Sequence, residues 1–324
     1  MRPRTISYLV FAGLIVAAAL LKLGPVVLAG LFAYMLLDLI HRHLAGRVPD
    51  LLARWLSVLV FLVTASALAY LFGQFIRLAI YRIPLIATSV LPAIEKLNTD
   101  YNLAIPYDSM EELRSALIAA VRENARSITA ESGLLTRGFF QIVIGLFIAI
   151  AKFLPDKERP RRASLFDELV GEFYARMELF MHSYEKVLGA QVLISAINTA
   201  ITLIFVLAAG IPYVYFLTLA TFILGIVPLI GNVAANAIII GAALTQSPQR
   251  AVAAFIFLVV SHKLQYPLNG RIMGSTLKTP MWATLLGILV GEVVLGVPGI
   301  ILAPAVLHYA REELASVPPS SPAA

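Results

Sequence analysis

Long apolar stretches, separated by short polar or glycine-containing turns, occupy most of this chain. Those that precede the C-terminal region fall at about Ile6–Leu21, Pro25–Ile40, Trp55–Ile80, Gly138–Leu154, Val187–Ala209, Tyr213–Ile230, Val233–Leu244 and Ala251–His262. A membrane-spanning helix needs about 20 apolar residues, and shorter stretches can span by tilting or by extending into flanking turns. The pattern predicts an all-α, polytopic helical membrane protein with about eight transmembrane helices.

The last apolar stretch, Met281 to Ala310, differs because Gly296-Val297-Pro298-Gly299 interrupts it. As one helix it would be about 45 Å long, against a hydrocarbon core of about 30 Å, and neither half alone can cross. We therefore expect a broken or re-entrant C-terminal hairpin. Glu292 is the single acidic or basic residue in this stretch. A charge at the bilayer centre costs about 2.5–3.5 kcal/mol, so Glu292 is a candidate functional or buried, paired group.

Two polar segments have helical patterns of their own. Residues 81–137 contain Ser109 followed by Glu112, a capping box that predicts an extracytoplasmic amphipathic helical insert. Residues 155–186 carry an apolar stripe among charges, which predicts a cytoplasmic helical segment. Both segments either lie on the bundle or the lipid interface, or take part in gating or partner binding. We expect one transmembrane domain over residues 1–317 and a disordered tail over residues 318–324.

Composition supports a membrane location and narrows the partners. Apolar residues make up 60% of the 324 and charged residues 14%, with a mean hydropathy of +0.86. Soluble domains average about 45–50% and about 25%, respectively. A net charge of +6 raises nucleic acid or anionic lipid as partners. Because the charges lie in loops between the spans, we expect a lipid bilayer and no nucleic acid.

Orientation follows from Lys and Arg in short loops, because cytoplasmic loops carry an excess of both. If the N-terminus is inside, the short outside turns hold only Lys22 and Arg250, apart from the long segment between Arg77 and Arg137. The inside segments then hold Arg2, Arg4, Arg42, Arg47, Arg54, Lys152, Lys157, Arg159, Arg161, Arg162, Arg176, Lys186, Lys263, Arg271, Lys278 and Arg311. We predict that both termini are cytoplasmic.

Polar residues inside the apolar stretches are candidates for a transport path. Gln191, Ser195, Asn198 and Thr202 recur at spacings of three or four, which places them on one face of a helix. Such a stripe either forms hydrogen bonds between helices or lines a hydrophilic passage, and the two are compatible.

A second candidate is the run Pro228-Leu229-Ile230-Gly231-Asn232. It is either a tight turn between two antiparallel spans or part of a translocation path. In the second interpretation Asn232 and Asn236, one helical turn apart, offer uncharged hydrogen-bonding groups.

Enzymatic and metal chemistry lack a motif. The chain has no cysteine, and it contains no His-Glu-x-x-His, Gly-x-Ser-x-Gly or Gly-x-x-x-x-Gly-Lys-Ser/Thr sequence. Asp38 and His41-Arg42-His43 have the character of an interfacial anchor rather than of a metal site. We expect no catalytic residue, no metal and no cofactor, and therefore no enzyme.

Several punctuating motifs resemble the autoinducer-2 exporter family of bacterial permeases. They are Gly189-Ala190-Gln191, Gly210-Ile211-Pro212-Tyr213, Val227-Pro228-Leu229-Ile230-Gly231, Gly270-Arg271-Ile272-Met273-Gly274, Pro280, Gly291-Glu292 and Gly296-Val297-Pro298-Gly299-Ile300-Ile301-Leu302-Ala303-Pro304. Gly270 and Glu292 depart from the family, where proline and a small residue are frequent, and they suggest a subgroup. The resemblance implies a multi-pass bacterial inner-membrane permease that exports a small polar molecule. It also implies a homo-oligomer, with five subunits.

The leading hypothesis is export of a small polar solute by a passive or proton-coupled route. Its candidate path or gate residues are Gln191, Asn198, Pro228, Gly231, Asn232, Asn236, Glu292, Gly296, Pro298 and Gly299. A sodium–proton antiporter is the first alternative, because broken helices and a carboxylate can exchange Na⁺ for protons. A membrane scaffold that recruits partners without transport is the second.

Overall fold

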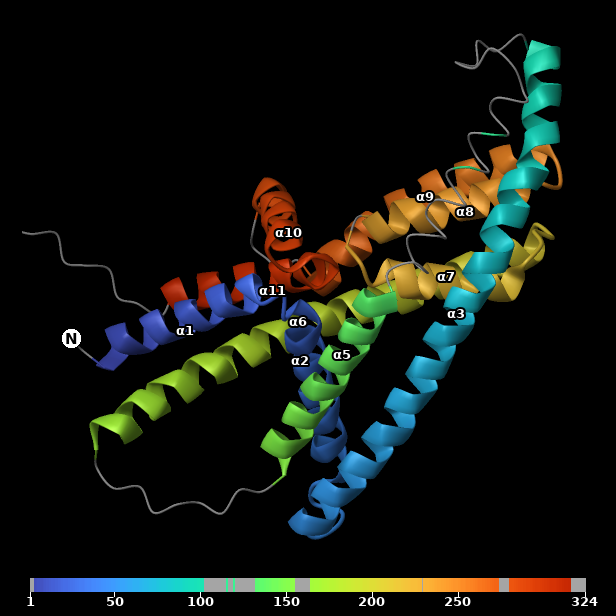
Figure 1. Ribbon diagram of the computed structural model, residues 1–324. Coiled ribbons are helices and arrows are strands. Elements are labelled where there is room, and N and C mark those ends of the chain that lie inside the picture. Colours follow the sequence, from blue (N-terminus) through green and yellow to red (C-terminus); the bar gives the residue numbers. More distant parts are fainter. Residues whose placement is uncertain are drawn as a thin grey trace, which may run out of the picture. The chain divides into compact units, whose positions relative to one another are not determined.

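The computed structural model describes residues 3–101, 115, 119, 132–154, 164–228, 230–273 and 280–315 (Figure 1). Within these ranges the named elements are all helices, and Ala45 and Val48 form an isolated bridge. The all-α prediction is confirmed for this part of the chain. The helices are α1 (Pro3–Leu20), α2 (Gly24–Leu44), α3 (Asp50–Tyr101), α5 (Ser132–Phe153), α6 (Leu165–Ala208), α7 (Val214–Gly225), α8 (Ile230–Leu244), α9 (Pro248–Met273), α10 (Met281–Leu295) and α11 (Val297–Ala315).

Among the described residues, four helices are long and apolar enough to cross a membrane. They are α2, the Asp50–Val90 part of α3, the Thr136–Phe153 part of α5, and α6. Shorter apolar helices are Thr5–Leu20, Val214–Gly225, Gly231–Leu244 and Trp282–Leu295. A multi-pass membrane protein is thereby supported, while the number of eight spans stays a prediction.

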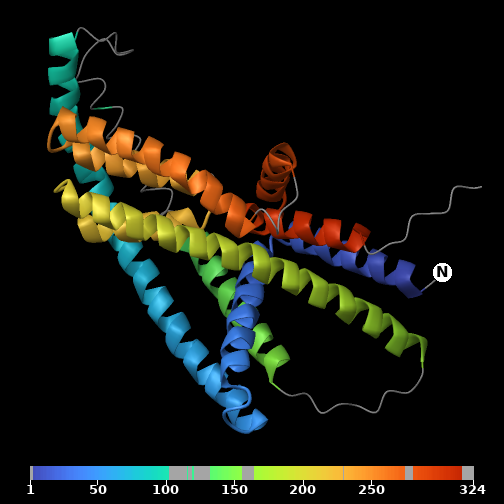
Figure 2. The ribbon, with the colours of Figure 1, turned by 180° about the vertical axis from the view of Figure 1, so that it is seen from behind.

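Two helices are longer than the apolar stretches that predicted them. Helix α3 continues through Pro84 and Pro92 to Tyr101, into the start of the expected polar insert. Helix α6 joins most of the expected cytoplasmic segment and the span after it in one rod, which Figure 2 shows without a break. At about 1.5 Å per residue they measure about 78 and 66 Å, so each outreaches a hydrocarbon core of about 30 Å. Ser109 and Glu112, the expected capping box, lie outside the described residues.

The chain forms two compact units. The first consists of Met1–Ser66, Thr136–Gly189 and Ser275–Ala324, and the second of Ala67–Leu135 and Ala190–Gly274. In the first unit, buried Leu37, Phe61 and Phe153 pack together from α2, α3 and α5. In the second, α8 and α9 run side by side (Figures 1 and 2), and their apolar side chains pack with those of α7 and α6.

Glycines allow the closest helix contacts inside the first unit. A Cβ added to Gly145 of α5 would lie 2.5 Å from the backbone oxygen of Val26 in α2, and one added to Gly299 of α11 would lie 1.8 Å from the oxygen of Gly291 in α10. No side chain fits at either distance. These glycines thus allow the backbone of α5 to contact that of α2, and the backbone of α11 to contact that of α10.

Candidate functional site

In the second unit, two polar side chains of α6 bind the carboxyl end of α7. The Gln191 Nε2 donates a hydrogen bond to the backbone oxygen of Gly225 at 2.8 Å. The Ser195 hydroxyl donates to the backbone oxygen of Phe222 at 2.7 Å. Carbonyl groups in the last turn of a helix lack partners within the helix, so these bonds satisfy them where water is scarce. Gln191 and Ser195 therefore serve contact between helices, one of the two roles that the sequence left open.

The rest of the polar stripe is also turned inward. The side chains of Asn198 and Thr202 are buried on the same face of α6, with exposures of 9% and 1%. The Thr199 hydroxyl is buried too, without a hydrogen-bond partner among the described residues. A passage along this face stays a prediction.

The Pro228 segment is the turn between α7 and α8. The Gly231 amide donates to the Val227 oxygen at 3.3 Å, and a Cβ on Gly231 would lie 1.7 Å from the Leu224 oxygen. Asn232 and Asn236 follow on α8, both half-buried. The Asn232 Oδ1 lies 3.7 Å from where a Cβ on Gly225 would stand, so Asn232 and Gln191 approach the same carboxyl end of α7.

The terminal segment is broken where the sequence predicted. Gly296 separates α10 from α11 with φ +68° and ψ −150°, a conformation essentially confined to glycine. Pro298 and Gly299 open α11, and the Gly299 amide donates to the Gly296 oxygen at 2.8 Å. The re-entrant placement of this hairpin in a membrane stays a prediction.

Glu292 is exposed on the side of α10 that carries Leu289 and Val293, away from the Gly291 contact with α11. It belongs to the first unit, whereas Gln191, Asn198, Asn232 and Asn236 belong to the second. The predicted site residues therefore form two groups that the structure describes separately.

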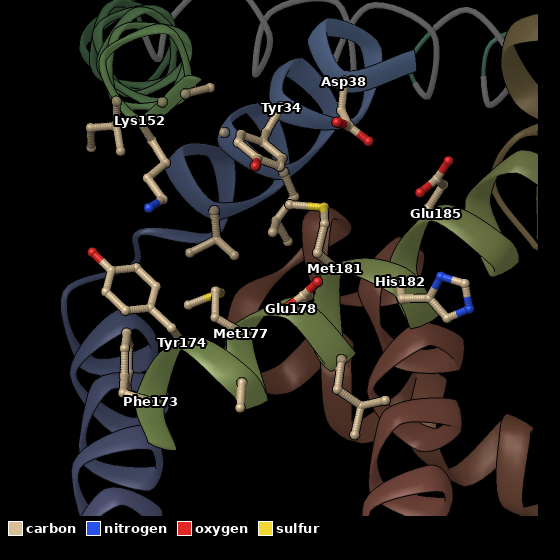
Figure 3. Close-up of a pocket in the computed structure, with 18 of the residues that line it drawn as sticks. Tyr34, Asp38, Lys152, Phe173, Tyr174, Met177, Glu178, Met181, His182 and Glu185 are labelled. Atoms are coloured by element: carbon tan, nitrogen blue, oxygen red, sulfur yellow. The ribbon is translucent and has the colours of Figure 1, made fainter. Parts of the chain in front are cut away.

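A cavity of about 1060 Å³ in the first unit lies between α2, α5 and α6 (Figure 3). One face of each helix lines it, and along α2 the lining changes from apolar Val26 to charged Asp38 and Arg42. The lining residues are Val26, Val27, Gly30, Leu31, Tyr34, Asp38, Arg42, Gly145, Ile148, Ala149, Lys152, Phe173, Tyr174, Ala175, Met177, Glu178, Leu179, Met181, His182 and Glu185. The cavity therefore has an apolar end and a charged end.

Ion pairing divides the charged groups of this cavity. Arg42 forms an ion pair with Asp38 at 3.0 Å and a hydrogen bond with Glu185. The Lys152 ammonium stands 4.3 Å from the centre of the Tyr174 ring, a cation–π arrangement visible in Figure 3. For Glu178, no ion pair occurs within the described part of the chain.

Sequence reasoning did not find this cavity. The sequence indicates an interfacial anchor at Asp38 and Arg42 and a helix with an apolar stripe within residues 155–186. A signal was present, since Tyr34, Asp38 and Arg42 recur every four residues, as do Glu178 and His182. Two polar stripes of this kind on different helices predict a shared polar space only when the helices are known to face each other.

A buried polar junction joins α1, α6 and α11 in the same unit. Arg176 has a side-chain exposure of 3% and pairs with Glu172 at 3.0 Å and Glu313 at 3.7 Å. It also donates to the Ser7 hydroxyl at 2.6 Å and lies 4.0 Å from the centre of the Tyr8 ring. A guanidinium can serve several partners at once because it presents five donors in a plane.

His308 is part of the same region. Its Nδ1 lies 3.0 Å from the Ser183 hydroxyl, and both side chains are buried. Like Arg176, it ties α11 to α6.

Apolar helices of spanning length, together with polar groups gathered at helix ends and in a cavity, are typical of multi-pass transporters. Residues 5–315 match the family model described as AI-2E family transporter. The chain belongs to this family, which confirms the resemblance found in its motifs. A search of curated proteins found no match.

Proposed function

We propose that this protein is a permease that exports a small polar molecule across the bacterial cytoplasmic membrane by a passive or proton-coupled route. The observation that carries the proposal is the family match over residues 5–315. The broken α7–α8 and α10–α11 connections support it, because interrupted helices are the places where membrane transporters present backbone and polar groups to a solute. Both termini would be cytoplasmic, and the working form would be a homo-oligomer, with five subunits implied by the resemblance.

The path in this proposal contains the α6–α7–α8 junction. Gln191 and Asn198 would lie on its wall, and Pro228, Gly231, Asn232 and Asn236 would shape it. Gly296, Pro298 and Gly299 would hold the terminal hairpin in place. Glu292 would act as the gate or the proton carrier, because it is the one carboxylate in the apolar stretch from Met281 to Ala310 and its side chain is exposed on α10.

Efflux from proteoliposomes tests this role of Glu292. Wild type, Glu292→Gln and the control Glu312→Gln are reconstituted, loaded with radiolabelled autoinducer-2, and assayed over a range of external pH. Glu312 is an exposed glutamate near the polar end of α11, so the control removes the same charge elsewhere. We expect wild type and control to show pH-dependent efflux and Glu292→Gln to lose the pH dependence. Unchanged efflux and unchanged pH dependence in Glu292→Gln would remove the coupling role.

The sodium–proton antiporter remains the second candidate, and the same carboxylate is what favours it. Sodium added to inverted vesicles that contain a pH-sensitive dye distinguishes the two functions. Dequenching that disappears in Glu292→Gln would favour exchange. The absence of a response over a broad pH range would count against it.

A further inference from the structure

We propose that the cavity between α2, α5 and α6 binds a small amphipathic amine as its ammonium ion, with Glu178 as the counter-charge. This inference goes beyond the proposed transport function, because the cavity lies in the first unit and the proposed path residues of α6, α7 and α8 lie in the second. Binding itself depends only on the first unit and can be measured without transport.

The size and polarity of the cavity fit a molecule with an apolar body and a polar end. Its volume of about 1060 Å³ is slightly larger than the about 300–1,000 Å³ of most small-molecule sites. Val26, Leu31 and Ile148 line the apolar end, and the backbone contact at Gly145 closes α2 onto α5 there. Charged side chains stand at the other end. A ligand that buries hydrocarbon at one end and keeps its charge at the other matches this gradient.

The sign of the ligand charge follows from the lining. Asp38, Glu178 and Glu185 are acidic, and Arg42 and Lys152 are basic. His182 also lines the cavity, and it forms no ion pair with Glu178 in the described part of the chain. Arg42 is already shared between two of the acids, and Lys152 stands over the Tyr174 ring. Glu178 is left as the acid without an ion pair among the described residues, so an added cation completes the balance. An anion would instead face three carboxylates with both cations engaged.

The walls near Glu178 suit an organic cation better than a metal ion. Figure 3 shows its carboxylate among Met177, Met181 and Tyr34. Thioethers are polarizable and adapt to irregular apolar shapes, and aromatic rings attract organic ammonium groups. A hard metal ion, by contrast, needs several oxygen ligands gathered around it.

Calorimetric titration of the purified full-length protein in detergent at pH 7.5 tests the proposal. Three probes of similar shape and different charge are used: 2-phenylethylammonium, 2-phenylethanol and 3-phenylpropanoate. We expect the ammonium to bind at least about tenfold tighter than the alcohol, and the carboxylate to bind most weakly, because a nearby charge pair of opposite sign is favourable only for the cation. Equal binding of the three probes would overturn the proposal.

Three variants test whether the ammonium binds in this cavity and whether the cavity favours positive charge. Glu178→Gln should weaken ammonium binding about three- to fivefold, because Glu178 is exposed and solvent weakens its attraction for the cation. Lys152→Met should tighten it about threefold, because it removes a like charge and frees the face of Tyr174. Glu168→Gln, an exposed acid on α6 outside the cavity, should leave it unchanged. Thermal unfolding of each variant checks that it is folded, and unchanged binding in Glu178→Gln or weaker binding in Lys152→Met would contradict the site.

The result is separable from that of the transport assay. Glu178-dependent amine binding without efflux of any solute would leave this site standing and remove the proposed function. Autoinducer-2 efflux without charge-selective amine binding would support the proposed function and remove this site.

Discussion

At Gly231, the backbone of α8 meets the end of α7 with no space for a side chain. A Cβ there would lie 1.7 Å from the backbone oxygen of Leu224. A backbone oxygen, unlike a side chain, cannot change rotamer to make room. The sequence marked this position through the Pro-x-x-Gly pattern, but as a turn or a path element. The structure adds that the glycine permits a close approach, which no local pattern could reveal because its partner belongs to the preceding helix.

Gly231→Ala should therefore destabilise the protein. We expect a loss of about 1–3 kcal/mol, the usual range for overpacking, seen as a lower midpoint of thermal unfolding. Gly189→Ala is the control, because a Cβ on Gly189 in α6 would meet nothing within 4 Å. Alanine there should stabilise slightly, since it is the better helix former. Equal midpoints for wild type and Gly231→Ala would refute the close approach.

Arg176 is the second residue whose environment sequence did not reveal. It looked like one of many cytoplasmic charges, yet its side chain is almost fully buried against Ser7, Glu172 and Glu313. Ser7 and Glu313 belong to α1 and α11, far from Arg176 in the sequence, whereas Glu172 belongs to α6 itself. Spacing within α6 predicts only the Glu172 pair, four residues away.

Removing the Arg176 charge should cost far more than removing a surface charge. Arg176→Met leaves Glu313, with 14% exposure, beside an apolar side chain, and breaking one side of a buried pair costs about 3–5 kcal/mol. Adding Glu313→Gln should recover part of the loss. Unfolding midpoints of the two single variants and the double variant measure the coupling. Additive effects would show that the two groups do not interact.

Among the helices, α6 is the one whose role the structure changes most. The sequence predicts a polar stripe on its apolar half, either for hydrogen bonds between helices or as the wall of a passage. In the structure, Gln191 and Ser195 of this stripe donate hydrogen bonds to backbone carbonyls of α7. Apolar stretches were enough to predict most helices, because each long stretch must bury its backbone in helical hydrogen bonds. They did not predict where α3 ends or where α6 begins, because proline inside α3 and charge along the first half of α6 both argue for a break that does not occur.

The contact between α6 and α7 can be tested through Gln191→Leu. Loss of one hydrogen bond between helices should lower stability by about 0.5–1.5 kcal/mol, seen as an earlier thermal transition. Thr218→Val is the matched control, because the Thr218 hydroxyl donates within its own helix, to the Val214 oxygen at 2.8 Å. Efflux per folded molecule is measured alongside. An unchanged midpoint with reduced efflux would assign Gln191 to a passage wall instead.

The α10–α11 hairpin depends on Gly296 in a similar way. Its φ of +68° with ψ of −150° is strained for any residue with a side chain. Gly296→Ala should cost about 1–3 kcal/mol. Gly138→Ala in α5, where an added Cβ meets nothing within 4 Å, serves as the comparison in the same unfolding assay. Equal stability of the two variants would show that the break does not need glycine.

For the whole molecule, orientation is the prediction that rests on charge alone. The natural chain has no cysteine, so each introduced cysteine is a unique label. In right-side-out vesicles, Ser115→Cys should react with a membrane-impermeant maleimide, and Ser320→Cys should react only after permeabilisation. We expect this labelling pattern because the excess of Lys and Arg in the predicted inside loops places both termini in the cytoplasm and the segment that contains Ser115 outside. The reverse pattern would place both termini outside.

The contact of Gly145 with α2 also sets how a ligand would be selected. Bare backbone fixes the spacing of α2 and α5 at the apolar end of the cavity, where a Cβ would meet Gly30 and the Val26 oxygen within 3.0 Å. Backbone cannot yield, whereas Met177 and Met181 near the charged end can change rotamer. The cavity should therefore be strict about the girth of a molecule's hydrocarbon part and tolerant of the shape around its charge.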